Sequence, residues 1–174
     1  MNPRVSVVVP AYNNAEYLAA TLDSVLAQEI TDYELVVADH SSSDATAEIL
    51  GRYASHPKVR VLPPTPTGGG ALANWNRVSR HARGELLKLV CGDDLVAPGL
   101  LREQVGALDA HPGAVLVACT RDVIDASGRV LIHDRGLAGL EGRVSGADAL
   151  RATVRAGTNI FGEPGCVLFR RDLL

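Results

Sequence analysis

The chain has 174 residues, of which 47% are hydrophobic and 21% are charged, and its formal net charge at pH 7 is −3. These values are typical of one globular domain with a sizeable core, and the weak negative charge argues against nucleic acids and anionic membrane surfaces as binding partners. The 3 cysteines are far apart and odd in number, so we predict a reducing compartment and no disulfide framework.

The N-terminus and the hydropathy pattern predict neither a signal peptide nor a membrane span. The first apolar run stops at Pro10, too early for a signal peptide, and no run reaches the roughly 20 apolar residues that a span requires. We expect a cytoplasmic protein, with the inner face of the membrane as a second location. The histidines are scattered, and we expect them to be surface or structural residues: His40, His56, His81, His111 and His133.

The first third of the chain alternates predicted strands and helices. Strands are predicted over residues 5–9, 35–38 and 59–62, with helices over 14–27 and 44–54 between them. Asn14 is the expected N-cap of the first helix, and Ser43 or Asp44 that of the second. Strands and helices at this spacing predict βαβ units with right-handed crossovers.

Residues 63–70 form a segment of prolines followed by Gly68, Gly69 and Gly70. Proline stiffens its first half and glycine frees its second, so we predict a loop over a binding site. Residues 68–73 match G-x-G-x-x-A, but the match follows the third strand rather than the first, which disfavours a dinucleotide site.

The pattern of apolar residues in the remaining chain predicts further helices and strands. A helix is expected over 72–81, a strand from 86 to the acids Asp93 and Asp94, a helix over 100–111 and a strand over 115–119. Beyond these we expect a hairpin over 123–132, a helix from Ser145 to about residue 154 and a last strand over 167–169.

Asp93 and Asp94 follow a buried apolar run directly. Ligands of open α/β sheets bind at the carboxyl ends of the strands, and neighbouring carboxylates repel one another unless a cation or several donors offset them. Hard divalent cations take carboxylate oxygens together with substrate phosphates. Taken alone, the pair is equally consistent with a metal site and with a turn or helix N-cap.

Four blocks together resemble the family 2 glycosyltransferases of the GT-A fold. They are residues 5–13, residues 22–28, residues 33–44, and the set of Asn76, residues 82–85 and Asp93-Asp94. They occur in the family's order and cover about the first hundred residues. The resemblance implies an α/β, Rossmann-like, mostly parallel sheet flanked by helices, with a C-terminal acceptor-side extension. We expect a nucleotide-sugar-binding region over 1–122 and an acceptor-side region over 123–174.

The resemblance also implies an activity. A sugar would pass, with inversion, from a nucleotide-diphosphate sugar, UDP-type favoured, to a hydroxyl of a glycan, a lipid-linked molecule or a small molecule, assisted by Mn²⁺ or Mg²⁺. Asp93 and Asp94 would hold the metal and so stabilise the leaving group, and Asp39 would accept from the imide N–H of the base. The implied donor-binding residues are Pro10, Ala11, Tyr12, Asn13, Asp39, Ser41, Gly70, Asn76 and Asp93.

The chain departs from the family pattern at several positions. Cys91 stands where the acidic motif usually begins with aspartate, and His40 replaces the second acid of the loop after the second strand. Gly68 replaces an asparagine, and Asn74-Trp75-Asn76 replaces the usual Ala-Arg-Asn. We expect Trp75 to pack under the glycine segment, with stacking on the donor as the alternative.

The catalytic base is the main open question. In the family it is an acid beyond a strand that resembles residues 166–171, so we expect a truncated chain, with Glu163 as a weak candidate. A non-catalytic nucleotide- or sugar-binding fragment therefore stays open. A nucleotidyltransferase does too, although its glycine loop normally follows the first strand.

Overall fold

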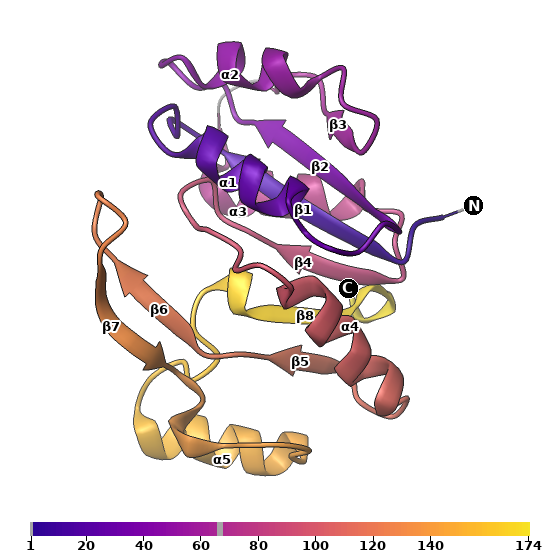
Figure 1. Ribbon diagram of the computed structural model, residues 1–174, viewed down its shortest axis with the longest axis vertical. Helices are drawn as coiled ribbons and strands as arrows, with labels where there is room; N and C mark the ends of the chain where they lie inside the picture. The colour runs from indigo at the N-terminus through magenta and orange to yellow at the C-terminus, as the bar shows by residue number, and fades with distance from the viewer. Residues whose placement is uncertain (1, 66–67) are drawn as a thin grey trace. The chain divides into compact units, whose positions relative to one another are not determined.

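The computed structural model describes residues 2–65 and 68–174 (Figure 1). It contains two compact units, one of Met1–Val117 with Leu168–Leu174 and one of Ala118–Val167. The functional division into residues 1–122 and 123–174 stays a prediction. Of the predicted loop over 63–70, residues 66 and 67 lie outside the described residues.

The first unit is built on a six-stranded sheet with strand order β3-β2-β1-β4-β8-β5. Strands β1 to β4 pair in parallel, and β8 is antiparallel to β4. This confirms the predicted α/β fold with a mostly parallel sheet flanked by helices. The elements are β1 (Val5–Ala11), α1 (Leu18–Leu26), β2 (Tyr33–Asp39), α2 (Thr46–Tyr53), β3 (Val59–Val61), α3 (Gly70–Arg80), β4 (Leu86–Leu89), α4 (Leu100–Ala110), β5 (Leu116–Ala118), β8 (Val167–Arg170) and the 3₁₀ turn η3 (Arg171–Leu173).

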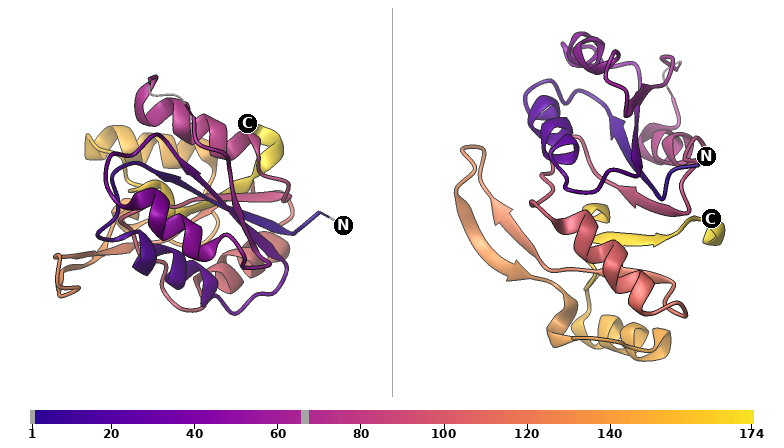
Figure 2. Two further views of the ribbon diagram at one scale, coloured as in Figure 1. Left: turned by 90° about the horizontal axis from the view of Figure 1, so that it is seen from above. Right: turned by 45° about the vertical axis from the view of Figure 1, so that its right-hand side comes forward.

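Apolar clusters cover both faces of this sheet. Alternate residues of a strand point to opposite faces: Val7 and Val9 join the cluster that contains α1, α2 and α4 side chains, whereas Val8 joins the cluster of α3. Figure 2 shows α3 on the opposite side of the sheet from α1. Burial on both faces explains why β1 reads as a continuous apolar run.

The second unit contains a hairpin and a helix. Its elements are β6 (Arg121–Ile124), β7 (Val130–Arg135), η1 (Leu137–Gly139), α5 (Gly146–Ala156) and η2 (Pro164–Cys166). The predicted hairpin is confirmed, and Asp125 stabilises its turn by accepting from the backbone N–H groups of Ser127 and Arg129 at 2.9 and 3.1 Å. Ser145 is the predicted N-cap of α5 and accepts from the N–H of Asp148.

Several predicted boundaries are wrong. Helix α1 begins at Leu18 rather than after Asn14, because the Asn14 side chain accepts from the backbone N–H of Tyr12 at 2.8 Å and so holds the preceding turn. Strand β4 ends at Leu89, and a turn rather than a strand carries the sequence on to Asp94. No helix within 2–65 and 68–174 is long and apolar enough to cross a membrane.

Candidate functional site

A cavity of about 430 Å³ lies where β1, β2 and β4 end, beside the start of α3. In open α/β sheets this edge is where ligands bind. The cavity is lined by Pro10, Tyr12, Asn14, His40, Gly68, Gly70, Ala71, Asn74, Trp75, Cys91, Gly92 and Asp93. Of the predicted donor-binding residues, Pro10, Tyr12, Gly70 and Asp93 are among them.

The turn after β1 and the loop after β2 are joined by hydrogen bonds. The backbone N–H of Asn13 donates to Ser42 Oγ at 2.9 Å, and Asn13 Oδ1 accepts from the backbone N–H of Ser43 at 2.8 Å. Tyr12 is 58% exposed, and its ring meets that of His40 at 64° with 6.4 Å between the centroids. The turn therefore presents an accessible aromatic ring at the mouth of the cavity.

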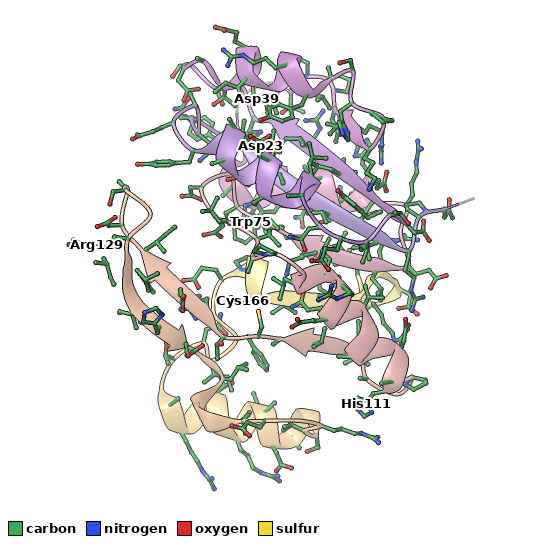
Figure 3. All side chains as sticks on the ribbon, in the orientation of Figure 1. Asp23, Asp39, Trp75, His111, Arg129 and Cys166 are labelled. Atoms are coloured by element: carbon green, nitrogen blue, oxygen red, sulfur yellow. The ribbon has the colours of Figure 1, made fainter. Side chains whose placement is uncertain are left out.

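Asp39, the last residue of β2, organises the loop that follows it. It is 7% exposed, and its Oδ1 accepts from the backbone N–H and the hydroxyl of Ser42 at 3.1 and 2.5 Å. Ser41 adopts a φ of 56°, and its hydroxyl donates to the carbonyl of Thr65. Neither Asp39 nor Ser41 is among the residues lining the cavity. Figure 3 labels Asp39 at this end of β2.

Asn74 and His40 lie at the cavity, and neither was expected there. Asn74 Nδ2 donates to the carbonyls of Ala11 and Ala38 at 3.2 and 3.0 Å, so α3 is tied to the ends of β1 and β2. His40 is 8% exposed, and its backbone N–H donates to the same Ala11 carbonyl at 3.0 Å. Asn76, the asparagine selected from the family pattern, is exposed and lies outside the lining.

Trp75 has two kinds of contact. It packs against the apolar cluster of α3, and it also lines the cavity beside Gly68 and Gly70. Figure 3 labels its position. The only sequence signal for Asn74 was the departure from the family's Ala-Arg-Asn, which did not indicate which asparagine faces the cavity.

Cys91, Asp93 and Asp94 form the acidic part of the site. One potential ligand atom from each lies within 4.8 Å of those from the other two. The turn causes this, since the backbone N–H of Asp94 donates to the carbonyl of Cys91 at 3.1 Å. Two carboxylates and a thiol this close fit one divalent cation, with oxygen ligands suited to Mg²⁺ or Mn²⁺ and a sulfur that favours softer ions.

Glu163 belongs to the second unit. Its carboxylate pairs with the guanidinium of Arg121, and its side chain is 51% exposed. The chain also passes close to this pair at Gly162, where an added Cβ would clash with the guanidinium of Arg121. The role of Glu163 as a base stays a prediction.

Comparison with known proteins identifies a family and several relatives. The family model for glycosyl transferase family 2 matches residues 6–174. The putative glycosyltransferase EpsE of Bacillus subtilis is 34% identical over 127 residues, which are 72% of this chain and 46% of EpsE. The chondroitin synthase of Escherichia coli is 32% identical over 130 residues, which are 74% of this chain and 19% of that protein.

Two solved structures match the whole chain in fold. The mannosyltransferase PcManGT from Pyrobaculum calidifontis, in complex with GDP-Man and Mn²⁺, has a TM-score of 0.69 and 27% identity, and the match covers 46% of that chain. Residues 1–349 of TarS from Staphylococcus aureus, in complex with UDP-GlcNAc, have a TM-score of 0.68 and 22% identity, with 46% covered. This chain therefore spans less than half the length of each of these four proteins.

Proposed function

The chain belongs to glycosyl transferase family 2, and we propose that its first unit binds the nucleotide-sugar donor of a metal-assisted, inverting sugar transfer. The observation that carries this proposal is that the cavity at the strand ends reaches the group of Cys91, Asp93 and Asp94. A nucleoside can occupy the cavity while the acidic group binds a metal ion beside the diphosphate. UDP is the favoured nucleotide.

The proposed nucleoside contacts come from the end of β1, the loop after β2 and the start of α3. The exposed ring of Tyr12 offers a stacking surface. The neighbouring members of the proposed set are Pro10 and Ala11, at the end of β1, and Asn13, in the turn that follows it. Asp39, which the loop holds in place, would accept from the base, and Gly70 allows close approach to the ligand because it has no side chain. Ser41 and Asn76 complete the proposed set, with Ser41 acting through the loop.

Asp93 and Asp94 would hold a divalent metal ion, Mn²⁺ or Mg²⁺. Such an ion, when bound, neutralises the charge that develops on the diphosphate leaving group. The protein would contribute the carboxylates of Asp93 and Asp94, which lie together on one turn. The GDP-Man and Mn²⁺ complex of PcManGT supports this pairing of nucleotide and metal.

The acceptor side is proposed for residues 123–174. The acceptor would supply a hydroxyl, from a glycan, a lipid-linked molecule or a small molecule, and a carboxylate would remove its proton. Glu163 is the candidate within this chain. We propose the cytoplasm as the location, free or at the inner face of the membrane, on the grounds of the cysteine pattern.

Two other functions are separated by simple assays. A non-catalytic binding fragment would bind the nucleotide sugar without releasing nucleotide, so the measurement is turnover with a nucleotide-sugar donor. A nucleotidyltransferase would prefer a nucleoside triphosphate to a nucleotide sugar, so the comparison is between those two ligands.

Calorimetric titration of UDP, with and without Mn²⁺, tests the donor site. We expect binding that requires Mn²⁺ and weakens at least about tenfold in Asp94→Ala, because one of the two carboxylates is lost. Asp32→Ala is the matched control, since Asp32 is an exposed aspartate at the opposite end of β2. Absence of binding of UDP, GDP and dTDP with any divalent metal would contradict the proposal.

A further inference from the structure

Two cysteines of the second unit, Cys119 and Cys166, lie opposite one another on antiparallel segments. Cys119 follows β5 and Cys166 precedes β8, and these two strands are neighbours in the sheet. The backbone N–H of Cys119 donates to the carbonyl of Cys166 at 3.1 Å. Farther along, the backbone N–H of Arg170 donates to the carbonyl of Val115 at 3.0 Å. Residue numbers fall along one segment as they rise along the other, so the two cysteines form a cross-strand pair.

The geometry of this pair suits a disulfide bond. Directly opposite residues of antiparallel segments have Cα atoms about 4.5–5.5 Å apart and side chains on the same face, and a disulfide requires Cα atoms about 4.4–6.8 Å apart. The side chains are also in contact. Cys119 Sγ donates to the carbonyl of Cys166 at 3.4 Å, and a hydrogen bond joins the two thiols. The backbone can therefore hold the bond without a large rearrangement.

Two further contacts hold the same segments together. The guanidinium of Arg121 pairs with the carboxylate of Glu163, and the backbone N–H of Cys166 donates to the carbonyl of Glu163 at 2.9 Å. The second unit consists of residues 118–167, so the two cysteines lie close to its two ends. A covalent bond between them would close the whole unit into a loop.

The two thiols differ in accessibility. Cys166 is 5% exposed, whereas Cys119 is partly exposed. The hydrogen bond with the Cys119 thiol and burial both raise the pKa of the Cys166 thiol. The thiolate is the nucleophile in exchange reactions, so an external reagent meets Cys119 first. Cys166 is then the thiol that lies ready to attack the product.

We propose that Cys119 and Cys166 are a redox-active pair, which forms a disulfide by exchange with a small-molecule disulfide and closes the second unit into a covalent loop. In the first step the Cys119 thiolate attacks one sulfur of the reagent, whose S–S bond breaks, and the released thiolate takes up the proton that Cys119 lost. In the second step Cys166 loses its proton, attacks Cys119 Sγ and displaces the second thiol of the reagent. The protein dithiol is oxidised by two electrons and the reagent is reduced to two thiols.

Such a pair is compatible with a reducing compartment. Disulfides of proteins in reducing compartments are usually transient and often sense oxidants, so Cys119 and Cys166 would be thiols, as they are in the structure, until an oxidant accumulates. The bond would fix the turn of Glu163 against the segment of Arg121. Neither cysteine lines the cavity at the strand ends, so this inference does not depend on the proposed donor site.

The first test maps the disulfide by peptide mass. Trypsin separates the three cysteines, because Cys91 lies in the peptide of residues 89–102, Cys119 in that of 103–121 and Cys166 in that of 156–170. The folded protein is incubated with oxidised glutathione, alkylated and digested. We expect peptides 103–121 and 156–170 to be joined, and dithiothreitol to separate them.

The same reaction in urea is the control for the role of the fold. In the unfolded chain Cys91 and Cys119 close a shorter loop than Cys119 and Cys166, so their bond should form at least as often. In the folded protein the Cys119–Cys166 bond should exceed the Cys91–Cys119 bond by at least about tenfold, because only the former pair is held within bonding distance. A folded protein that forms no internal disulfide, or one that involves Cys91, would overturn the inference.

The second test measures the effect of the bond on stability. The oxidised protein should have a thermal midpoint at least about 5 °C above that of the reduced protein, because the bond closes a long loop. Cys119→Ser should show neither the joined peptides nor this rise, whereas Cys91→Ser should retain both. An equal rise in Cys119→Ser would show that the reagent acts elsewhere. If the joined peptides form without a rise, the bond does not lock the second unit. In either case the inference is wrong, and the proposed function is unaffected.

Discussion

At the scale of single residues, Cys91 distinguishes this acidic group from one made of carboxylates alone. A thiol is a poorer ligand than a carboxylate for hard ions and a better one for soft ions. We expect Cys91→Asp to raise the affinity for Mn²⁺, measured in the presence of UDP, by about tenfold. The affinity for Cd²⁺ should change in the opposite direction. Parallel changes for both ions would show that Cys91 does not contact the metal.

Gly92 is a second residue that matters to the site, because it has no side chain. An added Cβ would lie 2.7 Å from Asn14 Oδ1, the atom that accepts from the backbone N–H of Tyr12. We expect Gly92→Ala to displace Asn14 and to weaken UDP binding several-fold, at a cost in stability of about 1 kcal/mol. Calorimetry and thermal unfolding measure the two effects.

Gly106→Ala is the control for this substitution. An added Cβ at Gly106 has nothing within 4 Å, and alanine is favoured over glycine within a helix by about 1 kcal/mol. This variant should be at least as stable as the wild type and should bind UDP equally well. If Gly92→Ala were as stable as the wild type and bound UDP equally well, the close approach of Gly92 to Asn14 would not matter for UDP binding.

At the scale of elements, Glu34 joins three segments of the first unit. Its carboxylate accepts from Ser6 Oγ on β1 at 2.6 Å, from the backbone N–H of Arg83 at 2.7 Å and from Arg60 on β3 at 3.0 Å. Burial raises the pKa of Glu34, but these hydrogen bonds outweigh burial and hold the pKa below its ordinary value of 4.5. The charged form is therefore the one that stabilises the fold.

The pH dependence of stability follows from the lowered pKa of Glu34. With a pKa lowered by folding, the contribution of Glu34 is complete above the ordinary pKa and is lost as the pH falls through the folded-state pKa. Glu34→Gln should reduce the free energy of unfolding by about 1–3 kcal/mol at pH 7, and its deficit should shrink below about pH 4.5.

Urea unfolding at several pH values measures the effect of Glu34→Gln. Glu48→Gln is the control, because Glu48 forms an exposed pair with Arg52 on α2, and such pairs contribute little. A Glu34→Gln deficit that is the same at pH 3 and pH 7 would contradict the assigned charge state.

At the scale of the whole molecule, donor binding should appear as a gain in stability. A ligand at about 100 times its dissociation constant stabilises the folded state by about 2.7 kcal/mol, which for a domain of this size raises the thermal midpoint by about 5–10 °C. We expect this shift with UDP and Mn²⁺ together, its loss when EDTA removes the metal, and a reduced shift in Asp94→Ala. A shift of the thermal midpoint that persists in EDTA would show that nucleotide binding does not require the metal ion.

Much of the fold could be predicted because its signals are local. The apolar run of β1, the second strand ending on Asp39 and the Ser145 cap of α5 each depend on a few adjacent residues, and all three are confirmed. The start of α1 could not be predicted from Asn14, because that side chain is used by the turn before the helix. Local preference was overridden there by a tertiary requirement of the loop.

The sequence by itself determined the alternation of strands and helices, the family, and the placing of Asp93 and Asp94 just beyond β4, because all of these depend on neighbours in the chain. Only the tertiary structure decided that Asn74 rather than Asn76 faces the cavity, and that His40 is buried there. The partners of Asn74 are carbonyls 63 and 36 residues away. No local pattern encodes such contacts, since they exist only once the ends of β1 and β2 are brought against α3.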